Sequence, residues 1–411
     1  MSGVLFLTHR IPLPPNKGDK IRSYHWLQAL RRDHEVYVAT FVDAHEDQAF
    51  VPELRSQCAD AYVARLRPTL RRLWSARGLL TGDPLTLAYY SDRGLRGWVE
   101  KILRSGRVDR VVVFSSSMAQ FVDRAAADGM RCIIDFCDVD SDKWAQYAAR
   151  RGWPLDWIYR RESARLCRSE QDLAQRFDAS VFVSAQEAGL FQRLTRLAGE
   201  RIGSVGNGVD IRYFDPAAAL ASPFAPEQRA IVFTGAMDYW ANIEAVTWFA
   251  HEILPLIRKT QADSWFYIVG SNPPPAVQRL ARLEGIRVTG RVPDVRPYLQ
   301  HACAAVAPLR IARGVQNKVL EAMAMGRHIV ATSAAVAGLD IPPPEHVYVE
   351  DGPAGFAARV AALLQRRPPP FSQANRNFVL EHFDWARQQE SFLRIVAGAA
   401  AEPRTVSSRS M

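Results

Sequence analysis

The sequence predicts an α/β protein with two Rossmann-like, doubly wound domains. Short apolar runs alternate with longer helical stretches, and this pattern occurs twice along the 411 residues. Runs that are apolar on both faces and separated by helices indicate parallel strands covered on both sides. An Ala/Pro-rich stretch, Asp215–Pro226, separates the halves and is typical of a linker. We therefore expect an N-terminal domain at 1–215 and a C-terminal domain at 226–380, facing each other across a cleft, with ligands beyond the carboxyl ends of the strands.

The predicted strands are the apolar runs themselves. In the first half they are Val4–Thr8, Val36–Val42, Arg110–Phe114, Cys132–Phe136 and Ser180–Ser184. In the second half they are Ala230–Thr234, Trp265–Gly270, Ile286–Gly290, Ala302–Pro308, His328–Thr332 and Val347–Val349. Near the end we expect helices around Gln373–His382 and Trp385–Val396, with the crossover helix at 381–400 packing back on the N-terminal domain. The polar tail, 401–411, is predicted to be disordered.

Composition narrows the class of protein. Apolar residues make up 48% and charged residues 23%, which is typical of a globular protein with a full core. The net charge of +9 favours anionic partners such as phosphates or an acidic membrane surface, and no nucleic-acid-binding module is recognisable. The five cysteines are scattered without a C-x-x-C pair, which disfavours a disulfide framework or a zinc site. Without a signal-peptide pattern or an apolar stretch near ~20 residues, the protein is expected to be cytoplasmic.

The stretch 313–326, Arg-Gly-Val-Gln-Asn-Lys-Val-Leu-Glu-Ala-Met-Ala-Met-Gly, carries the strongest functional signal. We expect a helix that opens at Gly314, where the N–H groups of Gly314 and Val315 and the positive end of the helix dipole suit a diphosphate. Lys318 and Glu321 are three residues apart and share one face. Lys318 would add charge near the phosphates, and Glu321 would accept hydrogen bonds from a ribose diol. The alternative is an ordinary amphipathic helix with both side chains on its solvated face.

The loop after the first predicted strand is a second candidate. The strand ends at Thr8-His9-Arg10, and the loop runs from Ile11 to Asp19 and leads into a helix. Gly18 allows a close backbone approach to a substrate, and Asp19 is a candidate N-cap. A plain connection between strand and helix is the alternative.

A group of carboxylates, Asp135-Phe-Cys-Asp-Val-Asp-Ser-Asp142, follows the fourth predicted strand. Carboxylates at the end of a strand could bind a metal or orient an acceptor hydroxyl, and Asp138, like Gly18, is a candidate for positioning the donor or the acceptor. A calcium loop is disfavoured because the EF-hand Gly and terminal Glu are missing. The alternative is that Asp140 or Ser141 caps the next helix.

Two loops of the second half lie where ligands of such sheets bind. Gly235–Asn242 follows the first strand there, and Gly290–Asp294 follows a later one. The first loop lacks the G-x-G-x-x-G pattern, which disfavours a dinucleotide dehydrogenase. Gly235, Met237 and Arg291 are the candidate ligand contacts of these loops.

One further segment is basic and apolar at once. Arg65–Leu80 carries five arginines with leucines and Trp74 among them. A helix of this kind could lie on an anionic membrane surface. The alternative is a solvated basic face over a packed one. The stretch 150–168 is also rich in arginine.

Taken together, these segments resemble the retaining glycosyltransferases of family 4, which have the GT-B fold. The resemblance spans nearly the whole chain, and its strongest parts are Val183-Ser-x-x-Glu187, Asn207-Gly-Val-Asp210, Gly235, Gly270, Gly290 and Gly314–Gly326. The chain looks closer still to the sugar transferases associated with PEP-CTERM/exosortase exopolysaccharide systems. The segments that carry this impression are His9–Arg22, Asp135–Trp144, Phe233–Trp240 and Gly314–Met325.

The resemblance implies transfer of a sugar from a nucleotide-diphosphate donor, with retention and without a cofactor or catalytic metal. The nucleotide-sugar would sit mostly on the C-terminal domain and the acceptor, a glycan or polyprenyl-linked glycan at the inner membrane face, on the N-terminal domain. In front-face attack the leaving phosphate helps to take the acceptor proton, so support of that phosphate is the main contribution of the protein.

The family's site residues carry over position by position. Of its two acidic residues in E-x7-E, the second matches Glu321 as the ribose ligand, whereas the first falls on Arg313. The Arg and Lys that the family often places after the first strand of the second domain have no counterpart in Met237–Asn242. Lys318, Arg310 or Arg313 would supply that charge instead. The candidate catalytic residues are Lys318, Asp138 and Arg310.

Two other functions remain open at this stage. A non-hydrolysing sugar-nucleotide epimerase has a similar two-domain fold and needs no acceptor. A non-catalytic sugar-nucleotide-binding protein is the other alternative, because Arg313 replaces an acid.

Overall fold

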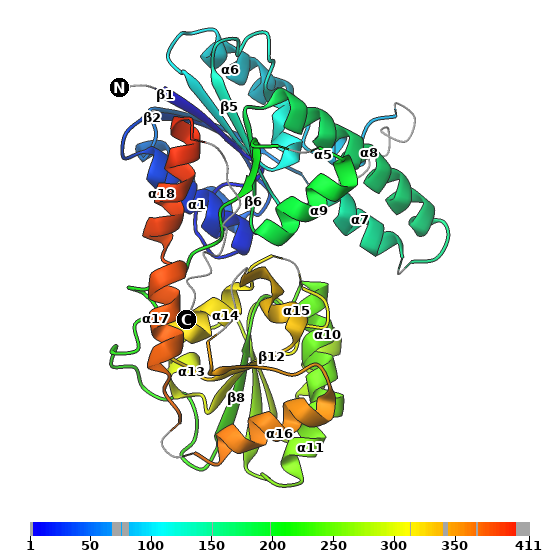
Figure 1. The fold of residues 1–411 in the computed structure, drawn as a ribbon, viewed down its shortest axis with the longest axis vertical. Helices are drawn as coiled ribbons and strands as arrows, with labels where there is room; N and C mark the ends of the chain where they lie inside the picture. The colour runs from blue at the N-terminus through cyan, green and yellow to red at the C-terminus, as the bar shows by residue number, and fades with distance from the viewer. Residues whose placement is uncertain are drawn as a thin grey trace. The chain divides into compact units, whose positions relative to one another are not determined.

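The computed structural model describes residues 3–67, 75, 82–149, 151–197, 199–312, 314–339, 344–366 and 369–399. The chain divides into two units, Met1–Val205 with Gln389–Met411 (unit 1) and Gly206–Gln388 (unit 2). Each unit has its own parallel sheet with helices against it (Figure 1). The predicted fold class, two doubly wound α/β domains, is confirmed.

The sheet of unit 1 has seven parallel strands in the order β3-β2-β1-β4-β5-β6-β7. Its strands are β1 Gly3–Thr8, β2 Glu35–Val42, β3 Asp60–Arg65, β4 Arg110–Phe114, β5 Arg131–Cys137, β6 Ala179–Phe182 and β7 Ile202–Ser204. Every residue of β1 is buried, as the apolar run predicts for a central strand. The strand order reverses between β1 and β4, whose ends Thr8 and Phe114 are paired in register. Ligands of doubly wound sheets bind at such a reversal.

The described helices of unit 1 surround this sheet or extend from its side. They are α1 Gly18–Leu30, α2 Val51–Ser56, α5 Leu85–Tyr89, α6 Arg93–Leu103, α7 Asp140–Ala148, α8 Leu155–Arg176 and α9 Ala185–Thr195, with short 3-10 turns η1 Glu46–Phe50 and η2 Ser116–Phe121. In α6, for example, Leu95, Val99 and Ile102 recur at helical spacing and are buried, and the Asp92 side chain accepts a hydrogen bond from the Leu95 N–H as an N-cap.

The last helix, α18 Trp385–Ala397, begins in unit 2 and continues into unit 1. The Phe392 ring stacks on Trp26 of α1 with ring centroids 4.2 Å apart. The Arg131 guanidinium donates hydrogen bonds to the Ile395 carbonyl at 3.0 and 3.1 Å. Figure 1 shows α18 alongside α1. The prediction that the end of the chain packs back on the N-terminal domain is confirmed.

The sheet of unit 2 has six parallel strands in the order β10-β9-β8-β11-β12-β13. They are β8 Arg229–Thr234, β9 Ser264–Val269, β10 Ile286–Gly290, β11 Ala304–Ala307, β12 Ile329–Ala331 and β13 Val347–Val349. Its helices are α10 Trp240–Trp248, α11 Leu254–Arg258, α12 Pro275–Leu280, α13 Arg296–His301, α14 Asn317–Ala324, α15 Ser333–Val336, α16 Pro353–Leu364 and α17 Gln373–His382, with the π-helical turn η3 Phe249–Ile253 and the 3-10 turn η4 Ala337–Leu339. The order reverses between β8 and β11, so the same kind of ligand edge occurs here.

The structure adds two strands that the sequence analysis missed, β3 and β7. Strand β3 carries charged residues at both ends, Asp60 and Arg65, and is only partly buried at the edge of the sheet. β7 has only three residues and forms the other edge. Both are too short or too polar to show as apolar runs.

The Asp215–Pro226 stretch lies within unit 2 in this division. The Gln300 side-chain amide donates hydrogen bonds to the carbonyls of Pro216 and Ala218 at 2.9 and 2.7 Å, so part of the stretch is attached to α13. The division of the chain falls after Val205 instead.

Two predicted segments cannot be compared with the structure. Most of the basic stretch Arg65–Leu80 and the tail 401–411 lie outside the described residues. Within the described ranges, no helix combines the length and apolar character that crossing a membrane requires.

Candidate functional site

The ligand edge of unit 2 is built by two loops that touch. Gly235, directly after β8, has a φ of +154°, a backbone conformation that glycine adopts readily and other residues rarely adopt. A Cβ atom on Gly270, after β9, would lie 1.7 Å from the Gly235 carbonyl oxygen. The Asn242 side-chain amide donates to the Ala236 carbonyl at 2.8 Å and closes the loop onto α10. The backbone at the end of β8 is therefore held in one place by close contact.

The helix of the 313–326 stretch begins later than predicted. α14 starts at Asn317, with Gln316 as its N-cap residue, whereas Gly314 has a φ of +56° and precedes the helix. A Cβ atom on Gly338 would lie 2.1 Å from the Gly314 carbonyl oxygen, so this bend is tightly packed from behind. The expected start at Gly314 is wrong because its left-handed backbone cannot continue a right-handed helix. The first turn of α14 still has the N–H groups and the dipole end that favour an anion.

Lys318, in the first turn of α14, reaches across to the loop after β8. Its Nζ donates to the Asn242 Oδ1 at 3.0 Å and lies 5.1 Å from the centroid of the Phe233 ring. Its Cε is 3.3 Å from where a Cβ on Gly235 would stand, so a larger residue there would crowd the lysine. Burial lowers the pKa of Lys318 to about 8.

Glu321 lies one turn further along the same helix. It is partly exposed, as Lys318 is, whereas Val319, Leu320 and Ala322 are buried in the core. Burial raises the pKa of Glu321 to about 7, and attraction to Lys318 opposes that rise. The prediction that the lysine and the glutamate share one face is confirmed.

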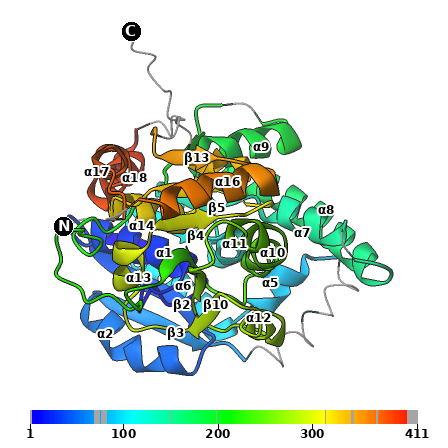
Figure 2. The same ribbon diagram turned by 90° about the horizontal axis from the view of Figure 1, so that it is seen from below.

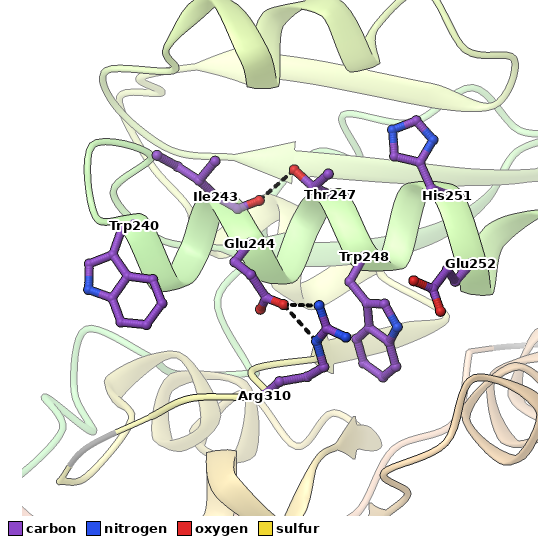
Figure 3. Close-up of a pocket in the computed structure, with 8 residues that line it drawn as sticks. All are labelled: Trp240, Ile243, Glu244, Thr247, Trp248, His251, Glu252 and Arg310. Carbon is purple, nitrogen blue, oxygen red and sulfur yellow. Dashed lines mark hydrogen bonds and ion pairs between the residues drawn. The ribbon is translucent and has the colours of Figure 1, made fainter. Parts of the chain in front are cut away.

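Arg310 occupies a different place from Lys318. Its guanidinium binds the Glu244 carboxylate, with Nε 2.6 Å from Oε1, and lies 5.1 Å from the centroid of the Trp248 ring. Figure 3 shows this ion pair in a pocket of about 340 Å³ that runs along α10. The lining residues are Trp240, Ile243, Glu244, Thr247, Trp248, His251, Glu252 and Arg310. Lys318 and Glu321 are not among them, so the structure does not group Arg310 with the other two.

The remaining candidates of unit 2 differ in exposure. The Met237 side chain is fully buried in the hydrophobic core, and its backbone N–H donates to the Ser271 carbonyl at 2.8 Å. The sequence analysis named Met237 as a candidate ligand contact, and in the structure its apolar side chain fills the core below the loop. Arg291 is exposed after β10. Val315 is nearly buried before α14. Arg313 lies outside the described residues.

The ligand edge of unit 1 carries a cluster that the sequence analysis had not singled out. His9, directly after β1, stacks on Phe114 at the end of β4 with centroids 5.7 Å apart. Its Nε2 lies 3.3 Å from the Asp19 Oδ2. The Arg10 guanidinium bridges Asp19 and Asp43, at 2.8 Å to each. The nearby cations and hydrogen bonds hold the pKa of Asp19 well below its usual range although burial acts in the opposite direction.

Two expectations about this loop change. Asp19 is in the first turn of α1, whose N-cap residue is Lys17, so Asp19 does not cap the helix and instead anchors His9 and Arg10. Gly18 is exposed at the start of α1, and an added Cβ atom would meet nothing within 4 Å. Space therefore does not demand a glycine at position 18. The signal for His9 and Arg10 was their position at the end of the first predicted strand.

The carboxylates after β5 have protein partners. Asp135 is fully buried and accepts hydrogen bonds from the Arg22 guanidinium at 2.8 Å and the Trp26 indole at 2.6 Å. The Asp138 carboxylate lies 2.9 Å from the Lys143 Nζ. Among the residues that the structure describes, no group of three or more His, Cys, Asp or Glu side chains could hold a metal ion. Asp138 remains a candidate for positioning a substrate, and its carboxylate is held by Lys143.

Backbone N–H groups at the start of α7 donate hydrogen bonds to carboxylates of α8 and α9. The Val139 N–H donates to the Glu187 carboxylate at 2.9 Å, and the Ser141 N–H and hydroxyl donate to Glu170 at 3.1 and 2.6 Å. Neither Asp140 nor Ser141 caps the helix with its side chain, so that alternative is wrong. Burial raises the pKa of Glu170 to about 8.

Comparison with known proteins identifies the two-unit architecture. HepE from Anabaena, solved in complex with UDP and glucose, matches 97% of this chain and 100% of its own with a TM-score of 0.66 and 12% identity. WaaG, a glycosyltransferase involved in lipopolysaccharide biosynthesis, matches 96% and 100% with a TM-score of 0.62 and 15% identity. Sucrose-phosphate synthase from Thermosynechococcus elongatus matches 97% and 98% with a TM-score of 0.64 and 15% identity. The fold is GT-B.

A family match decides the class of enzyme. Residues 228–366, which hold the ligand edge of unit 2, match the family described as glycosyl transferases group 1. The chain is a glycosyltransferase. A search of the curated proteins finds no match. In this glycosyltransferase the matched region includes Lys318, Glu321 and Asn242, and the last of these was not a candidate from the sequence because its partner is 76 positions away.

Proposed function

We propose that this glycosyltransferase moves a hexose from a nucleoside diphosphate donor to a glycan or lipid-linked acceptor, with retention of configuration. One observation carries the proposal: the Lys318 ammonium is fixed by Asn242 beside Gly235, at the point where the strand order of unit 2 reverses. A cation there, next to the first turn of α14, suits the diphosphate of a donor.

The donor would bind along α14. The Lys318 ammonium and the N–H groups before and within the first helical turn would hold the diphosphate, with Gly235 leaving room for it. Glu321, one turn further on, would accept hydrogen bonds from the ribose hydroxyls. HepE has been solved with UDP and with UDP-glucose, so uridine donors are the first to test.

The chemical step would depend on the leaving diphosphate. As the bond to the sugar breaks, negative charge grows on the phosphate, and a fixed cation stabilises that charge more than it stabilises the bound donor. The phosphate oxygen can then take the proton of the attacking acceptor hydroxyl on the same face, which gives retention. We propose no catalytic metal, since Lys318 supplies positive charge, with Arg313 and Arg310 as further cations if Arg310 releases Glu244.

Unit 1 would hold the acceptor. The His9–Asp19 pair at the end of β1 offers a fixed imidazole for an acceptor hydroxyl, and Asp138 lies after β5. We propose that the acceptor is a growing exopolysaccharide, free or on a polyprenyl carrier, and that the enzyme works as a peripheral protein at the inner face of the membrane. The net charge of +9 supports an anionic surface as its partner.

The test combines a donor screen with two lysine variants. A UDP-sugar should raise the melting temperature of the wild type by mass action and should not do so in Lys318→Ala. With acceptor, Lys318→Ala should lower kcat/KM by about 10²–10³-fold, the range for loss of one group that stabilises developing charge. Lys259→Ala, which removes an exposed lysine after α11, is the matched control and should behave as wild type.

Two outcomes would contradict the proposal. One is that no common nucleotide-sugar stabilises the protein, and the other is that Lys318→Ala keeps full activity. Product analysis with donor alone separates transfer from epimerisation, because a transferase leaves the configuration of the donor sugar unchanged without acceptor.

A further inference from the structure

The turn that joins α7 to α8 exposes large apolar side chains. Trp153 is 86% exposed, Trp157 is 57% exposed and Leu155 is 41% exposed, all within five consecutive positions. Figure 1 shows α7 and α8 projecting together from the side of the unit 1 sheet with this turn at their far end, and Figure 2 shows the same projection from below. Single exposed apolar residues are common, but a cluster with two indoles at the end of a projection marks a contact site.

The projection is a firmly built element. Trp144 of α7 packs against Tyr159 of α8 with ring centroids 5.1 Å apart, and Tyr147 lies beside both rings. On the face of α8 that carries Tyr159, opposite Trp157, Leu166 and Leu173 are buried. Trp157 is therefore exposed on a helix that is packed against its neighbour, and Trp153 lies in the turn just before that helix.

A basic stripe runs along α8 from the same turn. Trp157, Arg160, Arg161, Arg165 and Arg168 follow the spacing i, i+3, i+4, i+8 and i+11, which places them on one side of the helix. The stripe covers about 16 Å at 1.5 Å per residue. Arg160, Arg165 and Arg168 are exposed.

Two acidic groups of α8 near the turn have partners within the protein, and Arg161 donates a hydrogen bond to the Asp83 carbonyl at 3.4 Å. The Asp156 carboxylate lies 3.6 Å from the Nη2 atom of Arg160, one helical turn further along α8, and pairs with it. Glu162 is buried, where its carboxylate accepts hydrogen bonds from the N–H groups of Leu85 and Thr86 at 2.7 and 2.9 Å. The exposed charged side chains of α8 between Trp157 and Arg168 are therefore arginines.

We propose that the α7–α8 turn is a membrane contact in which Trp153, Leu155 and Trp157 enter the interface of an anionic bilayer while the α8 arginines bind lipid phosphates. Indole rings favour the boundary between headgroups and acyl chains, and arginine forms paired hydrogen bonds with phosphate. Binding of this kind grows with buried apolar area and with attraction to anionic lipid. The combination of an apolar end and a basic flank matches both layers of a bilayer surface, whereas a nucleic acid would use only the flank.

This contact involves unit 1 alone and needs no donor. Its failure would thus leave the proposed sugar transfer intact, and the two are tested by different ligands. It also gives a lipid-linked acceptor a surface on which to meet the enzyme.

The experiment is flotation of the full chain with vesicles of phosphatidylcholine containing phosphatidylglycerol. The wild type should float with these vesicles and bind pure phosphatidylcholine much more weakly. Trp153→Ser with Trp157→Ser should weaken binding about tenfold or more, because the apolar area that enters the interface is lost. Arg165→Gln with Arg168→Gln should weaken binding mainly at low salt, since charge attraction is screened by salt.

Leu283→Ser is the matched control. Leu283 is an exposed apolar residue of unit 2, 38% exposed, and its loss should leave vesicle binding unchanged. Since the two tryptophans are exposed, the double variant should keep the wild-type melting temperature and donor binding, which shows that it is folded. Equal flotation of the tryptophan double variant and the wild type would overturn the proposal, as would binding by a protein partner without any vesicle binding.

Discussion

At the scale of single residues, Lys318 and Glu321 are the pair whose protonation matters most. Both lie on α14 in surroundings that burial makes unfavourable for charge, and each moderates the shift of the other. Their pKa values, about 8 and about 7, lie much closer together than those of a free lysine and a free glutamate. A bound diphosphate would raise the pKa of Lys318, so donor binding and proton uptake should be linked at pH values near and above 8.

The first prediction concerns the pH dependence of stability. As pH rises from 4.5 toward 7, native Glu321 keeps a proton that the unfolded chain releases, so its contribution to the free energy of unfolding falls. Between pH 8 and 10.5, native Lys318 has released a proton that the unfolded chain keeps, so its contribution rises. Subtracting the stability of Glu321→Gln from that of the wild type should isolate the first slope, and subtracting that of Lys318→Met should isolate the second.

Urea unfolding at six or more pH values measures these differences. Subtraction is needed because Glu170 and Glu187, whose pKa values burial also raises, titrate in the same range. Differences that stay flat across both windows would show that the two groups are solvated as in the unfolded chain.

At the scale of elements, the contact between the loops after β8 and β9 fixes the ligand edge of unit 2, where we propose that the donor binds. Gly270 lies against the Gly235 carbonyl, and Gly235 in turn leaves the space that the Lys318 side chain crosses. The positions of the two strand ends and of the first turn of α14 therefore depend on one another.

The second prediction is that Gly270→Ala destabilises unit 2. The added methyl group would overlap backbone at 1.7 Å, and a shift of the loop should cost about 1–3 kcal/mol, as overpacking usually does. Donor affinity should fall as well, because the Gly235 loop would move. Gly97→Ala is the control, since it is exposed in α6 with nothing within 4 Å of its Cβ atom, and it should stabilise by about 0.5–1 kcal/mol. Scanning calorimetry measures both, and an unchanged transition for Gly270→Ala would contradict the prediction.

The third prediction separates a functional role of Gly18 from a structural one. Because an added Cβ atom meets nothing within 4 Å, Gly18→Ala should leave the melting temperature unchanged or slightly raised. If substrate approaches this backbone as the sequence analysis expects, KM should rise several-fold. Steady-state kinetics decide the point, and unchanged kinetics would remove Gly18 from the site.

At the scale of the whole molecule, the chain crosses between its two units twice, after Val205 and within α18. The end of α18 joins unit 1 through buried contacts: Phe392 stacks on Trp26, which also donates its indole hydrogen bond to the buried Asp135. The last helix therefore completes the core of unit 1, although it follows the rest of that unit by more than 180 positions in the sequence.

The fourth prediction follows from that stacking. Phe392→Ala should destabilise unit 1 by about 3–5 kcal/mol, the usual cost of removing a buried phenylalanine ring. In scanning calorimetry the transition of unit 1 should move down while that of unit 2 changes little. Arg394→Ala, an exposed position on the same helix, should shift neither by more than about 0.5 kcal/mol. Equal effects of the two variants would mean that the helix end contributes little to unit 1.

The sequence by itself determined the class of fold and the placing of Lys318 and Glu321 on one helix. Apolar runs between helices define buried parallel strands because both faces of such a strand need cover, and this holds for every central strand of both sheets. The shared face of Lys318 and Glu321 followed from helical spacing, which is local.

Only the tertiary structure decided which distant groups meet. Lys318 donates a hydrogen bond to Asn242, and the Met237 side chain is buried in the core. His9 pairs with Asp19 and stacks on Phe114. Local spacing specifies none of these contacts. The late start of α14 depends on the left-handed Gly314 and its contact with Gly338. The exposed Trp153 likewise looks in sequence like any apolar residue, and only the packing of α7 and α8 leaves it in solvent. Contacts between distant segments depend on how the whole chain packs, so the residue types alone could not assign them.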